Sequence, residues 1–264
     1  MDAPHLHKYP RTRHLEGSRL QPGDDDLGQV VWSSLADRWL VIEEKVDGAN
    51  AGVSFDANGR LFLQSRGHFL TGGAREKHFA LLKTWAACHR ERLWEILGSR
   101  FLMYGEWVFA KHTTFYDRLP HFFLEFDVFD RDTGEFLDTD RRREMLRSSP
   151  VVSVPVLRQG LGRYLPRPDA MVVRSLYKGP HWRDRLRSQA AEHGLDVERV
   201  VRETDPADAA EGLYVKVEAD GRVVDRLKWI RSSFLTAVTE PETHWLNRPI
   251  VPNLLRDDVD LFRA

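Results

Sequence analysis

Hydrophobic and polar residues alternate over short runs towards both ends of the chain, and this pattern predicts β-strands there. Period-two alternation between turn-forming residues is typical of antiparallel strands. Asn58-Gly59 and Asp220-Gly221 each lie between two such runs and predict hairpin turns. The predicted strands cover residues 40–44, 51–55, 60–65, 101–109, 122–130, 151–157, 212–219 and 223–230.

Apolar residues recur every three to four positions in the middle of the chain, which predicts helices between the strands. One helix is predicted from residue 76 to 97, where Gly98 ends it. A short helix is predicted over 138–146, with Asp138 or Thr139 as its N-cap. Residues 177–202 read as mostly helical with a break near Gly194, residues 1–29 as loops with one short strand, and residues 232–264 as coil with one short helix.

This order of elements predicts an α+β fold, built from antiparallel sheets with flanking helices. The chain has 264 residues, of which 42% are hydrophobic and 30% charged, as expected for one globular domain over residues 1–264. No apolar run is long enough for a membrane span, and residues 1–8 lack the apolar core of a secretory signal. Cys88 is the only cysteine, which excludes an intrachain disulfide. These features predict a cytoplasmic protein without membrane association.

The formal net charge of −1 indicates that the chain as a whole is not a basic nucleic-acid binder. A local basic groove is still sufficient to hold phosphates. Three clusters of basic residues could contribute to one, and each is alternatively an ordinary solvated surface. They are Lys8, Arg11 and Arg13; 141–143; and Arg183, Arg185 and Arg187.

Lys45 is the first candidate for chemistry. It lies between two apolar runs in the stretch Glu43-Glu44-Lys45-Val46-Asp47-Gly48-Ala49-Asn50. A lysine in strand-like sequence is unusual because burial of an ammonium group is costly. Such lysines often serve as nucleophiles, because desolvation or nearby cations lower the pKa of the amine. The alternative is a surface hairpin with Asp47-Gly48 at its corner.

Four further stretches also place charged residues in strand-like sequence. Each alone is compatible with an edge strand, but with Lys45 they predict a polar site framed by two sheets. In residues 122–130 the alternation predicts aromatic side chains in the core and the acids Glu125 and Asp127 on the opposite face. The four stretches are Tyr104-Gly105-Glu106-Trp107, Glu125-Phe126-Asp127, Glu211-Gly212-Leu213-Tyr214-Val215-Lys216 and Arg226-Leu227-Lys228-Trp229.

In this order the five stretches resemble motifs I, III, IIIa, IV and V of the covalent nucleotidyltransferases, which include ATP-dependent ligases and mRNA capping enzymes. The resemblance covers about residues 40–231 and implies a nucleotidyltransferase (ATP-grasp-like) domain. DNA ligases and capping enzymes usually end motif I with arginine. This chain has Asn50 at that position, and in this its motif I resembles that of the RNA ligase branch typified by T4 RNA ligase 2. The run Arg11-Thr12-x-His14-Leu15 also resembles the ligase modules of bacterial RNA end-healing-and-sealing systems.

The resemblance implies an ATP-dependent RNA ligase that joins 5′-phosphate and 3′-OH ends of RNA, as in RNA repair. Lys45 would attack the α-phosphorus of ATP and expel pyrophosphate, and the resulting lysyl-AMP would pass AMP to the RNA 5′-phosphate before sealing. Glu211, helped by Asp47, would hold Mg²⁺ (or Mn²⁺). An end-healing kinase or phosphatase is a possible partner.

The remaining roles also follow from the resemblance. Lys216 and Lys228 would contact the ATP phosphates, with Lys228 at the α-phosphate. Glu106 would bind the ribose, Phe126 would stack on adenine, and Glu44 or its backbone would read the adenine edge. Asn50 and Arg66 would act on the RNA end and its phosphates. The family often has lysine where this chain has Arg226, so the role of Arg226 is open.

DNA ligases and capping enzymes carry an OB domain after motif V, whereas 33 residues follow Arg231 here. We therefore expect a nucleotidyltransferase domain with short terminal extensions and no OB domain. Three alternatives stay open: a small DNA ligase, a nucleotide- or RNA-end-binding module without catalysis, and, as the least favoured, a capping guanylyltransferase.

Overall fold

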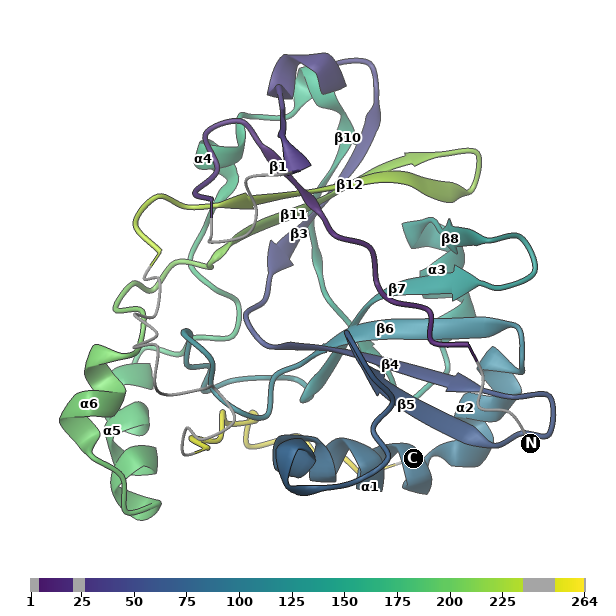
Figure 1. Cartoon of the computed structure of the whole chain (residues 1–264). Helices are drawn as coiled ribbons and strands as arrows, with labels where there is room; N and C mark the ends of the chain where they lie inside the picture. Colours follow the sequence, from purple (N-terminus) through teal and green to yellow (C-terminus); the bar gives the residue numbers. More distant parts are fainter. Residues whose placement is uncertain (1–4, 21–26, 235–249, 264) are drawn as a thin grey trace.

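The computed structural model describes residues 5–20, 27–234 and 250–263 of the chain. Its strands belong to one mainly antiparallel sheet, which Figure 1 shows as an upper and a lower half. The upper half runs in the order β10 (Val156–Leu161), β3 (Trp39–Lys45), β11 (Gly212–Ala219) and β12 (Arg222–Ile230). The lower half continues with β8 (Glu135–Leu137), β7 (Phe123–Asp130), β6 (Phe101–Trp107), β4 (Ala49–Phe55) and β5 (Leu61–Ser65).

The two halves are connected through β8, which pairs with β12 on one side and with β7 on the other. The two separate sheets expected from the sequence are therefore parts of one sheet. The α+β fold with antiparallel pairing is confirmed, and no OB barrel occurs in the part of the chain that the structure describes.

The strands β3 and β4 follow each other in the chain but do not pair. β3 pairs with β10 and β11, whereas β4 pairs with β5 and β6. Residues 46–48 therefore cross from the upper half of the sheet to the lower half. This rules out the surface hairpin at Asp47-Gly48 and places Lys45, the last residue of β3, where the two halves meet.

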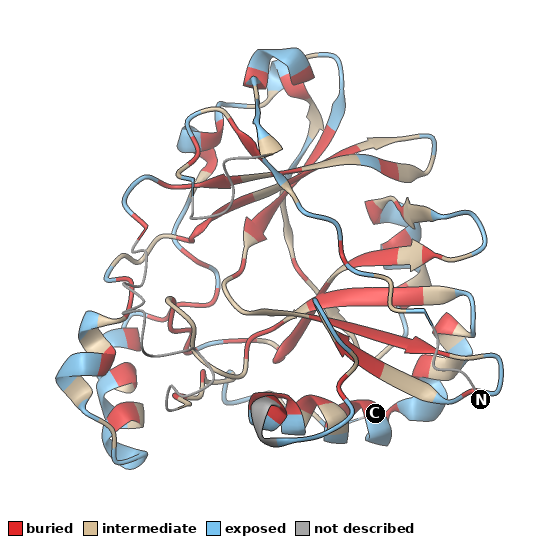
Figure 2. Ribbon diagram, in the orientation of Figure 1, coloured by how far each residue is buried: buried red, intermediate tan, exposed pale blue. Residues whose placement is uncertain are grey.

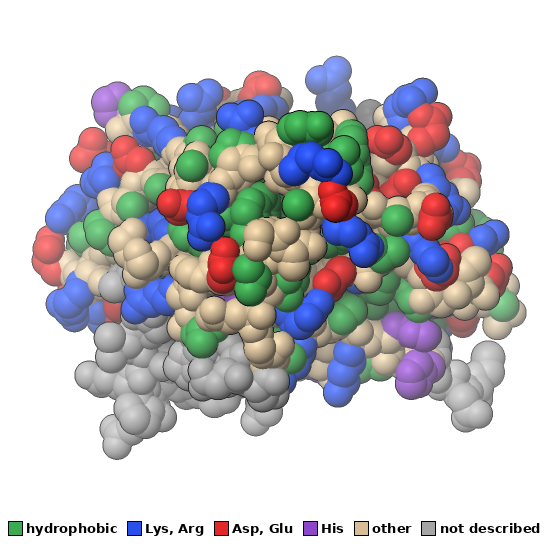
Figure 3. Space-filling view, turned by 90° about the horizontal axis from the view of Figure 1, so that it is seen from above, with side chains coloured by type: hydrophobic (Ala, Val, Ile, Leu, Met, Phe, Trp, Pro, Cys, Tyr) green, Lys and Arg blue, Asp and Glu red, His purple; other side chains and the backbone are tan. Residues whose placement is uncertain are grey.

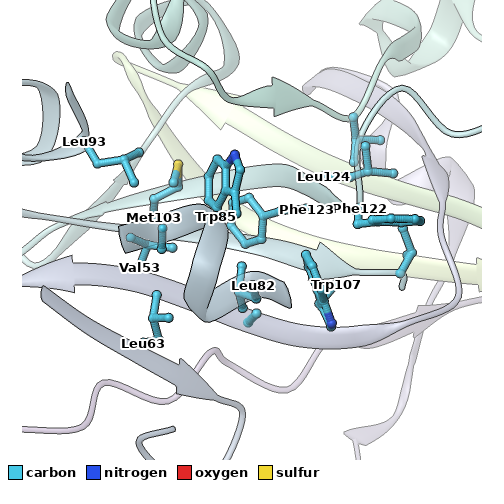
Figure 4. Packing of buried hydrophobic residues seen from close by; sticks show 14 of the residues in the cluster. Val53, Leu63, Leu82, Trp85, Leu93, Met103, Trp107, Phe122, Phe123 and Leu124 are labelled. Atoms are coloured by element: carbon cyan, nitrogen blue, oxygen red, sulfur yellow. The ribbon is translucent and has the colours of Figure 1, made fainter. Parts of the chain in front are cut away.

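Helices α1 (Ala80–Cys88) and α2 (Arg90–Leu97) cover the lower half of the sheet and enclose the largest apolar core (Figure 1). In Figure 4 the ring of Trp85 lies beside Phe123, and their ring centroids are 5.6 Å apart. The single helix predicted over residues 76–97 is wrong in detail, because a 3-10 helix (Ala74–Phe79) precedes α1 and His89 separates the two α-helices. Trp85 and Leu93, on either side of this break, bury their side chains in the same core.

The upper half of the sheet has a core of its own, built on Leu40, Ile42 and Val215. Short helical segments cover it: Trp32–Leu35, Gly162–Tyr164 and α4 (Pro168–Met171). Figure 2 shows the buried residues concentrated on the strands of both halves and on the inner sides of the helices.

The helices α5 (Trp182–Glu192) and α6 (Val197–Arg202) lie at one side of the molecule and pack around Phe115. They confirm the helical prediction for this region, including the break near Gly194. In α3 (Thr139–Leu146) the side chain of Asp138 accepts a hydrogen bond from the backbone N–H of Arg141, which confirms the predicted cap.

The strand predicted over 151–157 is divided, because its two parts pair with different neighbours. β9 (Val152–Ser153) runs parallel to β7, and β10 runs antiparallel to β3. Near the N-terminus two short strands form, β1 (Arg13–Leu15) and β2 (Gln29–Val30), where one was predicted. The predicted tail helix falls partly on 235–249, outside the described residues, and residues 250–263 contain no helix. Among the described helices, none is both long and apolar enough to cross a bilayer.

Candidate active site around Lys45

Lys45 and three carboxylates meet at the junction of the two sheet halves, and we call these four residues the Lys45 cluster. The ammonium Nζ of Lys45 donates to Glu211 Oε2 at 2.8 Å. Glu106 and Asp47 also attract the Lys45 ammonium electrostatically. The Lys45 side chain is 23% exposed, whereas that of Glu211 is 2% exposed, so the amine is the more accessible member of the ion pair.

The strand register explains why these residues meet. Lys45 on β3 pairs with Gly212 on β11, which directly follows Glu211. A Cβ atom on Gly212 would lie 1.9 Å from the carbonyl oxygen of Trp229, so only glycine permits this approach of β11 to β12. Glu106 arrives from the lower half on β6.

Asp47 anchors the crossing between the sheet halves. Its Oδ2 accepts hydrogen bonds from the backbone N–H groups of Thr113 and Thr114, both at 2.7 Å. Its own backbone N–H donates to the hydroxyl of Tyr116 at 2.9 Å. These bonds fix the turn that follows Lys45, although nothing in the sequence around Thr113 and Tyr116 singled them out beforehand.

Burial and the neighbouring charges shift the acidity of the cluster. Burial raises the pKa of Glu106 to about 8 and that of Glu211 to about 7, although Lys45 opposes both shifts. For Lys45, burial lowers the pKa, but the carboxylates, Glu211 first, outweigh it and leave the pKa raised. The amine is therefore protonated at neutral pH and has to lose a proton before it can act as a nucleophile.

Lys216, which the resemblance placed at the ATP phosphates, and Arg226, whose role it left open, both lie in a buried ion network that joins the two halves of the sheet. The side chain of Lys216 is fully buried, and its Nζ bonds Glu43 and the carbonyl oxygen of Phe126. Arg226 Nε donates to Asp127 Oδ2 at 2.8 Å. In this geometry the ammonium group of Lys216 is already bonded to Glu43 and to the carbonyl oxygen of Phe126, and its contact with the ATP phosphates stays a prediction.

Arg142 from α3 completes this network. Its guanidinium donates to Glu43 and to Glu125, each at 2.8 Å, and the side chain is fully buried. The sequence predicted Glu125 and Asp127 on the face of the strand opposite the core, but it did not predict that both carboxylates would be buried. Their burial is possible because each is ion-paired, which offsets the desolvation cost. The ion network thus comprises Glu43, Glu125, Asp127, Arg142, Lys216 and Arg226.

The side chain of Glu44 points away from the Lys45 cluster. Its carboxylate accepts hydrogen bonds from the hydroxyl of Ser175 at 2.6 Å and from the backbone N–H of Leu176 at 3.0 Å. Successive side chains on a strand point to opposite faces, so Glu44 and Lys45 do not face the same site. Only the backbone of Glu44 is left for the predicted contact with adenine.

Asn50 and Lys228 lie near the cluster. Asn50 is paired with Glu106 in the β4–β6 register, and its buried Oδ1 has no hydrogen-bond partner among the described residues. Lys228 attracts Glu211 electrostatically from β12.

Phe126 and Arg66 complete the predicted set. Phe126 is partly buried and packs against Tyr9 and Tyr214. Arg66 is exposed in the turn after β5, and it makes no hydrogen bond or ion pair with the described part of the chain. The structure therefore gives Arg66 no link to the cluster, and its role stays a prediction.

The cluster can accommodate a hydrated divalent cation. Hydrated Mg²⁺ commonly binds one or two protein carboxylates together with substrate phosphates. Glu211 and Asp47 supply such oxygens, with one oxygen of Asp47 already taken by backbone N–H groups. Within residues 5–20, 27–234 and 250–263, no three His, Cys, Asp or Glu side chains are arranged so that they could hold a metal ion by themselves.

Charges on the face seen in Figure 3 are mixed. Lysine and arginine side chains alternate there with acidic ones, and neither sign forms a continuous field. This agrees with the formal net charge of −1.

Comparison with protein families gives a match to the RNA ligase family over residues 38–230, which is more than half of the chain. The chain belongs to the RNA ligase family. The matched region contains every predicted site residue, from Glu44 to Lys228. Comparison with curated protein sequences finds no match.

Solved structures of RNA ligases share the fold. An archaeal ATP-dependent RNA ligase superposes with a TM-score of 0.51 at 16% identity, covering 86% of this chain and 49% of that chain. A Naegleria gruberi RNA ligase variant without ligand superposes with a TM-score of 0.50 at 16% identity, covering 87% of this chain and 59% of that one. This RNA ligase family member therefore spans about half the length of the solved relatives. At such identities the likeness establishes the fold.

Proposed function

We propose that this RNA ligase family member is an ATP-dependent RNA ligase that joins 5′-phosphate and 3′-OH ends of RNA through a lysyl-AMP intermediate. The observation that carries the proposal is the Lys45 cluster: a partly exposed amine at the junction of the two sheet halves, held by the carboxylates of Glu106 on β6 and of Glu211, directly before β11. Family membership and the ATP dependence stated for the archaeal relative support ATP as the substrate.

Lys45 is the proposed nucleophile. Its Nζ would form the bond to the α-phosphorus of ATP while the bond to pyrophosphate breaks. Glu211 Oε2 already accepts a hydrogen bond from Nζ and so orients the amine, whose proton would leave to solvent before the attack. A divalent cation bound at Glu211 and Asp47 would neutralise phosphate charge and lower the pKa of Lys45.

The other residues divide into two groups. Lys228, Glu106, Asn50 and Phe126 are proposed to contact the nucleotide or the RNA end, because each lies in or beside the cluster and none is fully buried. Lys216, Arg226 and the side chain of Glu44 are proposed to hold the strands of the site in place instead. We further propose RNA repair as the setting, with an end-healing enzyme as partner.

The test uses ATP labelled at the α-phosphorus. After incubation with Mg²⁺ or Mn²⁺, label should remain on the denatured wild-type protein and be released by acid, because a phosphoramidate bond is acid-labile. ATP labelled at the γ-phosphorus should leave no label. Lys45→Ala should abolish labelling, while Lys77→Ala, at an exposed position outside the cluster, should retain it. An unlabelled wild type, or a labelled Lys45→Ala variant, refutes the proposal.

Matched nicked duplexes then define the substrate. We expect sealing of a nick with an RNA 3′-OH end, and slower sealing when the same end is DNA. Efficient sealing of an all-DNA nick together with failure on RNA would identify a small DNA ligase. Transfer of guanylate from labelled GTP, but not adenylate from ATP, would identify a capping-type activity.

A further inference from the structure

The N-terminal segment, residues 5–13, crosses the junction between the two halves of the sheet, and Figure 1 shows it running in front of both. The carbonyl oxygen of His7 accepts hydrogen bonds from Gln64 Nε2 and from the hydroxyl of Tyr104, each at 2.7 Å. Both donors belong to the lower half. At its other end the segment enters β1, which pairs with β12 of the upper half. The segment thus connects the two halves independently of β8.

Tyr9 is the residue of this segment that enters the interior. Its side chain is buried, and its hydroxyl donates to Asp127 Oδ2 at 2.5 Å and lies 2.6 Å from the hydroxyl of Tyr214. Its ring packs edge-on against Tyr104 and Phe126, with centroid distances of 5.0 Å and 5.1 Å. One side chain therefore contacts both halves of the sheet.

The strand registers place Tyr9 next to the Lys45 cluster. On the upper half, Tyr214 pairs with Glu43, two residues along each strand from the pairing of Gly212 with Lys45. On the lower half, Tyr104 lies two residues from Glu106 on the same face of β6. Two residues of a strand span about 7 Å. On both halves of the sheet, the residues that contact Tyr9 therefore lie two strand positions from residues of the Lys45 cluster or from their pairing partners.

Two residues that bear on the nucleotide site depend on Tyr9. Phe126, the proposed adenine contact, packs against its ring, and the guanidinium of Arg226 lies 5.6 Å from the ring centroid. Arg226 also shares the acceptor Asp127 Oδ2 with the Tyr9 hydroxyl. A change at Tyr9 would therefore act on both.

We propose that residues 5–13 form a wall of the nucleotide site and that Tyr9 is a positioning residue, which fixes Phe126 and the Asp127–Arg226 pair for nucleotide binding. This inference rests on the proposed function. It assigns a role to a segment that lies outside the region matched by the family, residues 38–230.

Tyr9→Phe separates positioning from folding, because it removes the hydroxyl but keeps the ring. Asp127 keeps its bond from Arg226, and Tyr214 keeps a contact with the hydroxyl of Thr12 at 3.3 Å. Tyr164→Phe is the matched control, since Tyr164 is 77% exposed and its hydroxyl has no hydrogen-bond partner within the described residues.

The experiment measures lysine adenylylation against ATP concentration. Loss of a hydrogen bond to a charged group should raise the KM for ATP about tenfold in Tyr9→Phe, with the rate at saturating ATP within about twofold of wild type. Tyr214→Phe, which removes the same hydroxyl contact from the other side, should shift the KM in the same direction. The control should leave both parameters unchanged. A KM within about twofold of wild type in both Tyr9→Phe and Tyr214→Phe overturns the inference.

Calorimetry of ATP binding separates this inference from the proposed function. In a Lys45→Ala background no adduct can form at position 45, so binding reports on the site alone. We expect weaker ATP binding when Tyr9→Phe is added to this background, whether or not the wild type seals RNA. Equal binding with and without the tyrosine hydroxyl would overturn the inference, and leave the lysyl-AMP proposal standing.

Discussion

Replacement of Arg142 by methionine tests whether the buried ion network holds the two halves of the sheet together. The guanidinium reaches Glu43 on β3 in the upper half and Glu125 on β7 in the lower half, each at 2.8 Å. Methionine keeps most of the apolar volume but removes the charge. Glu43 would keep its ion pair with Lys216, whereas Glu125 would keep the hydrogen bond from the hydroxyl of Ser153 and a longer-range attraction to Lys216, but no ion pair.

The expected loss of unfolding free energy follows from the different partners that Glu43 and Glu125 would keep. Removal of one partner of a buried ion pair costs about 3–5 kcal/mol, because the remaining charge stays desolvated. Since Glu43 remains compensated, we expect a loss near the lower end, about 3–4 kcal/mol. For a domain of this size, that corresponds to a decrease in melting temperature of roughly 6–16 °C.

The assay is urea unfolding followed by tryptophan fluorescence. Arg143→Met is the control, because Arg143 lies on the same helix but is exposed and makes no ion pair with the described residues. Burial raises the pKa of Glu125, and loss of Arg142 raises it further, so folding of the variant favours the protonated acid. Its stability deficit should therefore grow as the pH rises, and Arg142→Met/Glu125→Gln should recover much of it. A deficit below about 1 kcal/mol, or one equal to that of the control, would refute the reasoning.

Two further predictions concern the Lys45 cluster. The pKa of Glu106 in the folded protein is about 8, above its ordinary value, so the folded state retains a proton that the unfolded chain releases. The free energy of unfolding should therefore fall as the pH rises from about 4.5 to 8. Urea midpoints compared across this pH range should fall less steeply in Glu106→Gln. Gly212→Ala should prevent stable folding, because its Cβ would overlap the carbonyl oxygen of Trp229, whereas Gly67→Ala meets no atom within 4 Å and should leave the urea midpoint unchanged. A Gly212→Ala protein as stable as Gly67→Ala would contradict the observed β11–β12 approach.

Local features of the chain were predictable because they depend on neighbouring residues. Period-two alternation gave β3 to β7, β11 and β12 within a few residues, and Asn58-Gly59 and Asp220-Gly221 gave their hairpins. The cap at Asp138 follows from a side chain three residues away from its donor. The ordered motifs predicted the RNA ligase family, which the match over residues 38–230 confirms. The roles of the individual site residues stay predictions.

Only the tertiary structure decided which strands pair and which charges are buried. Lys216 meets Glu43 across 173 residues, and Tyr9 meets Asp127 across 118. Strand alternation shows that two side chains face opposite ways, but it does not show which face receives a partner. Hence the alternation did not show that Glu125 and Asp127 are buried, nor that the carboxylate of Glu44 bonds Ser175. The sequence determined the identity of the nucleophile candidate, whereas long-range packing determined its surroundings, because an ion pair forms where folding brings distant charges together.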